Sequence, residues 1–388
     1  MSEIKVNSIK GVSASSAAIS IINTDGTCTA NITNNLSNRN KVINGAMICS
    51  QRTISASVTG STNAYVALDR FKSRNVHDGA YTLSQSTTSP DGFANSLKVD
   101  VTTADTSLAS NVRATIEHFI EAQDLQDLGY GTSSAKTITV SFYVRSNKTG
   151  NYGFSIEQAD NGFKQVTLQY TINSADTWER KTFTIAGDTS GVINNDEGSG
   201  LELYWWLAAG STYTSGSTRT TYTAYANGDF GAGQAVNLLD STSNEWYITG
   251  VQLEVNSSGV ATDFEHRSFA DELRRCQRYY AKYQAGTNYS IFLVTVGFGS
   301  NETDSRCKFD FVTEMRTPLP SFSYSSGSHF QDMSGKQLNI FLLADNGGTT
   351  KFTSMRTLFS QSFADAGKAY VIRAANNSDA YFEFDTEL

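Results

Sequence analysis

Short strand-like patterns follow one another through the middle of this 388-residue chain, and helical patterns hardly interrupt them. Runs such as Thr115–Glu121, Thr137–Val144 and Leu201–Ala208 are rich in β-branched and aromatic residues. Turn sequences such as Pro90–Gly92 separate them. Many short strands without intervening helices predict antiparallel sheets packed face to face. We therefore expect an all-β chain with a β-sandwich, of jelly-roll or carbohydrate-binding type, over residues 46–266.

The pattern changes period after Trp246–Val255, which alternates like a strand and is interrupted by Gly250 as a β-bulge would interrupt it. The apolar residues that follow are spaced four, three, four and three positions apart, which is the seam of an amphipathic helix; they are Phe269, Leu273, Cys276, Tyr280 and Tyr283. Ser268, with Asp271 three positions on, is a helix N-cap signal. We expect one short linking helix that spans residues 267–285.

This seam is too short to form a stable coiled coil by itself. Two interpretations stay open. The helix packs on a sheet edge, or identical helices from neighbouring chains meet on a symmetry axis and hold an oligomer together.

The two ends of the chain also carry strand patterns. In residues 1–45 an alternating run is followed by a hairpin pattern around Asp25-Gly26. So small a unit cannot build its own core, so it is either a flexible leader or is completed by neighbouring chains. Residues 286–388 contain further strand patterns and predict a C-terminal β domain.

Composition excludes several classes of function. The net charge is −8, and no run of Lys or Arg exceeds two residues, which argues against nucleic acid as a partner. No apolar stretch reaches membrane length and no signal-peptide pattern is present, so we expect a chain made in the cytoplasm without membrane insertion. The four cysteines lie far apart without a CxxC pair and are expected to be free thiols.

No motif predicts catalysis or a cofactor. The chain lacks nucleophile-elbow, zinc-protease, P-loop and dinucleotide fingerprints. A glycosidase needs two carboxylates across a cleft. Glu117, Glu121 and Asp124, or Glu202 with Asp196, could be offered, but ordinary surface carboxylates are the far more common explanation. Residues 194–198 and 345–347 have the oxygen-rich composition of calcium loops, which is also that of ordinary turns, so no metal is predicted.

Aromatic residues are the clearest binding candidates, because sugar rings stack on flat aromatic rings. Trp205 and Trp206 are neighbours in a strand and point to opposite faces, so at least one belongs to the core. Residues 210–239 are expected to form a long surface loop. The candidate ligand-binding residues are Trp206, Tyr213, Tyr222 and Tyr225 around this loop, with Tyr324 and Phe330 in the C-terminal domain.

Several segments resemble the tail-fibre proteins of marine and cyanobacterial phages. The resemblance is carried by VQLE, ATDFEHRSFADEL and RCQRYY between Val251 and Tyr280, which match a junction pattern of that group. It also includes SEIKVNSIKG, NRNKVINGAMICSQR, LDRF, AKTITVSFYVRSNKTGNY and the AYFEFDTEL ending, and so covers nearly the whole chain. Asp263 departs from the group, which commonly has Pro there, and this affects a turn.

The resemblance implies an elongated, homotrimeric structural protein of the virion. Residues 1–45 would attach to tail proteins of adaptor or nozzle type, and the distal domain would present a surface that recognises a host glycan or lipopolysaccharide. Many weak contacts repeated by symmetry would give avidity without catalysis. Two other functions stay open: a non-receptor structural part, such as a tail spacer or capsid decoration, and a glycan-cleaving fibre.

Overall fold

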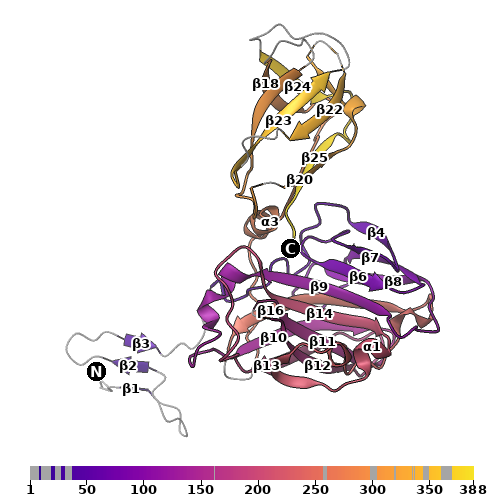
Figure 1. The fold of residues 1–388 in the computed structure, drawn as a ribbon, viewed down its shortest axis with the longest axis vertical. Helices are drawn as coiled ribbons and strands as arrows, with labels where there is room; N and C mark the ends of the chain where they lie inside the picture. The colour runs from indigo at the N-terminus through magenta and orange to yellow at the C-terminus, as the bar shows by residue number, and fades with distance from the viewer. Residues whose placement is uncertain are drawn as a thin grey trace, which may run out of the picture.

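The computed structural model describes residues 37–160, 162–256, 260–297, 304–318, 320–333, 335, 337–343, 349–359 and 369–388, and the backbone of three short strands nearer the N-terminus. These residues form two β domains, one above the other, joined by a short helix (Figure 1). The predicted all-β class is confirmed.

The larger domain is a sandwich of two antiparallel sheets. One sheet contains β4 (Ser55–Thr59), β7 (Ala80–Ser86), β8 (Ser96–Thr103), β10 (Ile138–Ser146), β13 (Glu179–Ile185) and β16 (Glu245–Val255). The other contains β5 (Asn63–Ala64), β6 (Lys72–Val76), β9 (Arg113–Glu121), β11 (Gly150–Gln158), β12 (Lys164–Ile172), β14 (Ser199–Ala209) and β15 (Arg219–Ala224). The strand orders are β13-β10-β16-β8-β7-β4 and β15-β12-β11-β14-β9-β6-β5. The predicted sandwich is therefore present, with six strands facing seven.

Alternating side chains build the core between the two sheets. On β10, Ile138, Val140, Phe142 and Val144 are all fully buried, as expected for one face of a strand. The ring of Phe142 meets Trp205 of the facing sheet edge-on at 5.8 Å. Burying large aromatic and aliphatic side chains from both sheets supplies the main stabilisation of this domain.

Gly250 forms the bulge that the sequence predicts. The register between β10 and β16 shifts between Ser141 and Tyr143, and Gly250 has a φ of +62°. A Cβ at this position would lie 2.8 Å from the ring of Phe93. Both the backbone angle and the lack of space require glycine here.

The predicted long loop at residues 210–239 is wrong in part. This segment contains α1 (Ser211–Thr214), β15 at the edge of the seven-stranded sheet and α2 (Asn227–Phe230), and the short 3₁₀ turn η2 (Leu238–Asp240) begins within it. Another 3₁₀ turn, η1 (Ala122–Leu128), follows β9. Thr-rich β15 pairs with β12, and this tertiary pairing outweighs the weak local pattern.

The linking helix α3 (Phe269–Gln277) is shorter than the predicted seam. The N-cap is confirmed, because the Ser268 side chain accepts a hydrogen bond from the Asp271 N–H. The seam itself is wrong as a helical feature, since Tyr280 and Tyr283 lie on a strand, β17 (Tyr280–Gln284). The domain boundary predicted at residue 285 therefore moves to the end of α3.

The described residues of the C-terminal domain form two sheets. Besides β17 its elements are β18 (Ile291–Gly297), β19 (Asp304–Asp310), β20 (Ser321–Tyr324), η3 (Gly327–His329), β21 (Phe330–Asp332), β22 (Leu338–Leu343), β23 (Phe352–Phe359), β24 (Ala369–Ala374) and β25 (Tyr381–Asp385). The orders are β17-β25-β20 and β21-β24-β18-β19-β23-β22. Phenylalanines fill the core, with Phe330, Phe341 and Phe382 in mutual ring contact. Pairing with β25 takes Tyr280 and Tyr283 out of the helix.

The N-terminal strands β1 (Ser8–Ile9), β2 (Ile19–Ile21) and β3 (Cys28–Ala30) form a small antiparallel sheet away from the sandwich (Figure 1). The pairing of β2 with β3 confirms the predicted hairpin; its turn lies outside the described residues. The boundary predicted at residue 45 is too far along the chain. Val42 is fully buried in the sandwich core, and the Lys41 N–H donates to Leu253 O at 2.9 Å.

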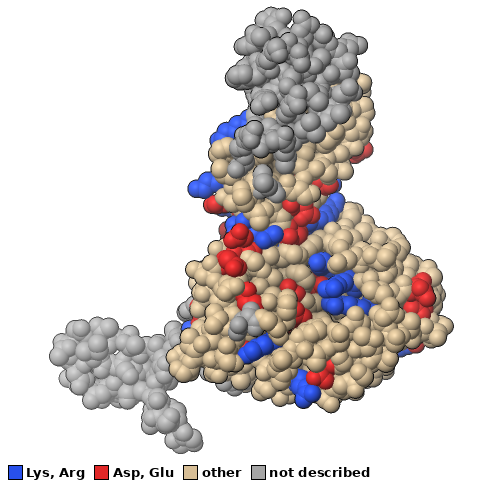
Figure 2. Space-filling model, viewed as in Figure 1, with Lys and Arg blue, Asp and Glu red and all other residues tan. Residues whose placement is uncertain are grey.

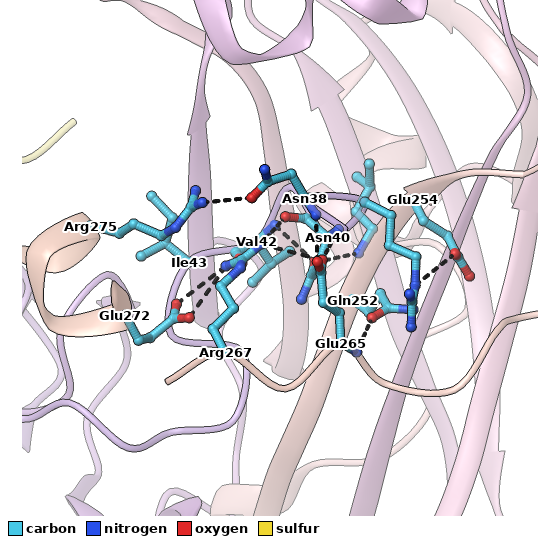
Figure 3. Close-up of polar contacts among 12 residues, drawn as sticks. Asn38, Asn40, Val42, Ile43, Gln252, Glu254, Glu265, Arg267, Glu272 and Arg275 are labelled. Carbon is cyan, nitrogen blue, oxygen red and sulfur yellow. Dashed lines mark hydrogen bonds and ion pairs between the residues drawn. The ribbon is translucent and has the colours of Figure 1, made fainter. Parts of the chain in front are cut away.

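Asparagines and carboxylates fasten the segment around Asn38–Asn44 to the sandwich (Figure 3). The Glu265 carboxylate accepts from the backbone N–H groups of Asn38 and Asn40. The Asn40 side chain bonds β16 through Val251 O at 3.1 Å and the Leu253 N–H at 3.1 Å. These side chains replace the strand partners that this irregular backbone lacks.

Ion pairs link the two domains at their interface. Arg70 is fully buried; its guanidinium pairs with Glu387 and lies 3.5 Å from the ring centroid of Tyr279. Arg52 pairs with Asp385 at 2.8 Å. These residues come from NRNKVINGAMICSQR, LDRF, RCQRYY and AYFEFDTEL, so four of the motifs that carry the resemblance meet at this junction.

Candidate functional site

The outer face of the seven-stranded sheet carries an unusual group of charged residues. Strand alternation turns Trp205, Phe154 and Ile116 into the core, so the residues between them point outwards. Register aligns Gln165, Glu157, Glu202 and Phe119 in one row across β12, β11, β14 and β9. The next row contains Thr167, Ser155, Tyr204, Glu117 and Lys72. We call Lys72, Arg74, Arg113, Glu117, Glu157 and Glu202 the sheet-face site.

Arg113 and Glu117 form the buried floor of the sheet-face site. The Arg113 guanidinium donates to Glu117 Oε1 at 2.8 Å, and the Thr115 hydroxyl donates to the same oxygen at 2.7 Å. Arg113 also lies over the rings of Tyr204 and Trp206, with 5.2 Å to the Tyr204 centroid. This aromatic enclosure holds the guanidinium in place.

Two carboxylates lie directly across from each other beside this floor. Glu157 of β11 is the register partner of Glu202 of β14, and like charges in this arrangement destabilise a sheet. Burial, followed by the negative charge of Glu202, raises the pKa of Glu157 to about 7. Burial also raises the pKa of Glu202, although the Tyr204 hydroxyl, which donates to it, acts in the opposite direction. Neither carboxylate has an ion pair with any cation in the described part of the chain.

Two buried acceptors near this pair have no hydrogen-bond donor among the described residues. They are Glu117 Oε2 and Gln165 Oε1. Gln165 is the register partner of Glu157, and its amide nitrogen donates to Ala226 O at 3.2 Å. Buried acceptors without donors are costly, so a donor supplied from outside the described residues would stabilise this face.

The exposed edge of the site combines an aromatic ring with positive charge. Tyr225 is 36% exposed; its ring lies 5.1 Å from Phe230 and its hydroxyl donates to Asn227 at 2.9 Å. Arg74 is exposed and Lys72 half-buried on β6. Figure 2 shows blue and red areas next to each other on the sandwich face over β9 and β14. The site can therefore offer donors, acceptors and one stacking surface.

Only one of the sandwich aromatics singled out by sequence is well exposed at this face. Trp206 is fully buried under Tyr213 and Phe230, so its interpretation as a stacking surface is wrong. Tyr213 is half-buried, and the half-buried Tyr222 packs edge-on against Tyr130 at 5.5 Å. The more accessible residue is Tyr225.

The other predicted residues lie elsewhere. Phe330 is fully buried in the C-terminal core, which excludes it as a surface ligand contact, and Tyr324 is half-buried against Phe341 at 5.3 Å. On the helix, Cys276 is fully buried with Cys49, and Leu273 packs against the same cluster. Of the helical part of the seam, only Phe269 is strongly exposed, at 59%.

Sequence reasoning missed Glu157, Arg113 and Gln165 and did not connect Glu117 with Glu202. A usable signal was present in β9, where Arg113, Thr115 and Glu117 alternate with Ala114 and Ile116. Polar residues on one side of a central strand predict a polar outer face. Which of them meet the carboxylates of other strands depends on register, which the local pattern does not give.

The hollows elsewhere on the described surface offer less. A hollow of about 690 Å³ beside α3 is lined by Arg267, Arg274, Arg275 and Arg278, but three of them already bind Glu272, Asn38 and Glu121. No group of three or more His, Cys, Asp or Glu side chains within the described ranges is placed to hold a metal ion. Residues 345–347 lie outside those ranges. Among the residues that the structure describes, no helix has the length and apolar character of a membrane span.

Comparisons with known proteins give weak likenesses. No family model and no curated protein matches the chain. Solved structures that it resembles include the enzymatically active domain of bacteriophage CBA120 tailspike protein 4 (TM-score 0.29, 10% identity, 56% of this chain and 21% of that chain). Another is a putative sugar binding protein from Bacteroides thetaiotaomicron (TM-score 0.31, 12% identity, 56% of this chain and 100% of that chain). A third is the family 11 carbohydrate-binding module of a Clostridium thermocellum cellulase (TM-score 0.27, 12% identity, 55% of this chain and 98% of that chain). Likenesses this weak say nothing about what the present chain binds.

Proposed function

We propose that this chain is a tail-fibre protein of a phage virion that binds a host-surface glycan or lipopolysaccharide, without catalysis, at the sheet-face site. The observation that carries the binding role is the group of uncompensated acceptors and cations beside the exposed ring of Tyr225. Sugar hydroxyls both donate and accept hydrogen bonds, and the apolar faces of sugar rings stack on aromatic side chains. The virion role is supported by the sequence motifs shared with phage tail fibres.

The remaining parts of the proposal follow the same resemblance. Three copies form the fibre, residues 1–36 attach it to adaptor- or nozzle-type tail proteins, and the chain is made in the host cytoplasm. The buried ion pairs of the junction support a fibre in which the two domains keep a fixed relation.

Adsorption competition tests this function. The purified chain is expected to bind host cells and to block infection by the parent phage, without releasing sugars from the cells. Tyr225→Ala is expected to weaken both effects. Tyr289→Ala is the matched control, because Tyr289 is also exposed, at 51%, but lies in the C-terminal domain.

Three outcomes contradict parts of the proposal. A chain that neither binds nor blocks is a structural link and not a receptor-binding protein. Loss of binding in Tyr289→Ala alone moves recognition to the C-terminal domain. Release of oligosaccharides makes the chain a glycan-cleaving fibre.

A further inference from the structure

We infer that the sheet-face site takes a glycan that bears a free primary ammonium group, as in a sugar with an unacetylated amine, held between Glu157 and Glu202. This inference rests on the proposed glycan-binding function and adds the chemical class of the ligand.

The first reason is the charge of the row that crosses β11 and β14. Glu157 and Glu202 face each other directly without an ion pair to a described cation. The Arg113 guanidinium, whose positive charge also acts on Glu157, is engaged with Glu117. A bound cation would relieve the repulsion between the two carboxylates.

The second reason is independent of charge and concerns the balance of donors and acceptors. Gln165 is fully buried, and its Oε1 has no donor although it lies next to Glu157 in the same row. Glu117 Oε2 also lacks one. A hydroxyl group brings one donor, whereas an ammonium group brings three donors and no acceptor. An excess of acceptors over donors around Glu157 and Glu202 therefore suits an ammonium group better than a neutral hydroxyl.

The third reason is the position of the cations, which orients the ligand. Lys72 and Arg74 lie on β6, on the opposite side of β9 from β14. An ammonium group is repelled there and attracted over β11 and β14. The hydroxyl-bearing remainder of the ligand then extends towards β9 and β6, where guanidinium and ammonium donors are available.

The test uses three tetrasaccharides with the same β-1,4 linkage, built from glucosamine, N-acetylglucosamine or glucose, and calorimetric titration of the full chain at neutral pH. The glucosamine tetramer is expected to bind at least about tenfold more tightly than the other two, as a charge-assisted hydrogen bond gives. Glu157→Gln and Glu202→Gln are expected to remove this preference. Glu197→Gln is the matched control, since it removes one negative charge at an exposed position away from the site.

The outcomes separate this inference from the proposed function. Equal affinity for the glucose and glucosamine tetramers overturns the ammonium inference and leaves glycan binding intact. Failure to bind the glucosamine tetramer also overturns it, and the adsorption assay on host cells then decides the proposed function separately. A preference that survives Glu157→Gln and Glu202→Gln but falls in Glu197→Gln reduces the effect to general attraction by an acidic protein.

Discussion

Replacing Glu157 by Gln is expected to stabilise the sandwich at neutral and alkaline pH. Burial, and then the charge of Glu202, raises the pKa of Glu157 from 4.5 to about 7. Between these two values the folded chain binds more protons than the unfolded chain, so the stability of the native protein falls as pH rises. At about 1.4 kcal/mol per pKa unit, the ionised carboxylate destabilises the folded state by about 3 kcal/mol above this window and not at all below it.

Urea unfolding at about pH 5 and about pH 8 measures this effect. All four tryptophans lie in the sandwich, so their fluorescence reports on that domain. The gain in the free energy of unfolding is expected to reach about 3 kcal/mol at the higher pH and to shrink towards zero at the lower pH.

Glu179→Gln is the control with the opposite sign. Although burial acts to raise it, the pKa of Glu179 is lowered to about 2 by the Lys181 ammonium and by N–H donors of Ser174 and Asn173. Its charge therefore stabilises the folded state above the unfolded pKa of 4.5, and the variant is expected to lose stability at both pH values. The reasoning about Glu157 fails if Glu157→Gln changes stability equally at both pH values, or destabilises the sandwich at the higher one.

Four further results are expected. Tyr225→Ala weakens adsorption to host cells about tenfold, as loss of a stacking contact predicts, with an unchanged melting temperature; a lowered melting temperature would make the residue structural. Arg70→Met lowers the free energy of unfolding by about 3–5 kcal/mol, because it removes the guanidinium that pairs with the buried Glu387 carboxylate. Denaturant unfolding, together with proteolysis of the junction, measures this loss. Phe269→Glu dissociates an oligomer held through α3, and an unchanged mass in solution removes this helix from the interface. Deletion of residues 1–36 leaves a folded chain that no longer joins the particle, and normal assembly contradicts the anchor role.

The sequence predicts most of the sandwich because its central strands are strongly patterned. β10 places four apolar side chains on one face, and Gly250 marks the bulge in the neighbouring strand β16. The start of α3 at Ser268 is also determined by local sequence, since the capping hydrogen bond is made within three residues. The end of α3 is determined by a contact that is distant in sequence. Tyr280 continues the helical spacing but pairs with Asp385, more than a hundred residues later.

The candidate site is less predictable for the same reason. Aromatic residues signal sugar stacking by their type, but type does not tell which ring is covered. Trp206 is covered by α1 and α2 residues, whereas Tyr225 is left accessible. The opposition of Glu157 and Glu202 exists only through the pairing of β11 with β14, so the sequence holds both residues without indicating that they meet.

The C-terminal domain is attached to the sandwich at two places. The chain enters it through α3, and the segment after β25 returns to the sandwich, where Glu387 meets Arg70 and Arg52. The two attachments also contact each other, because the Thr386 N–H donates to Tyr279 O at 2.7 Å in the linker between α3 and β17. A single linker would let one domain swivel about the other. Two attachments side by side resist torsion, so a mechanical load on either domain is shared between the covalent chain and the buried ion pairs.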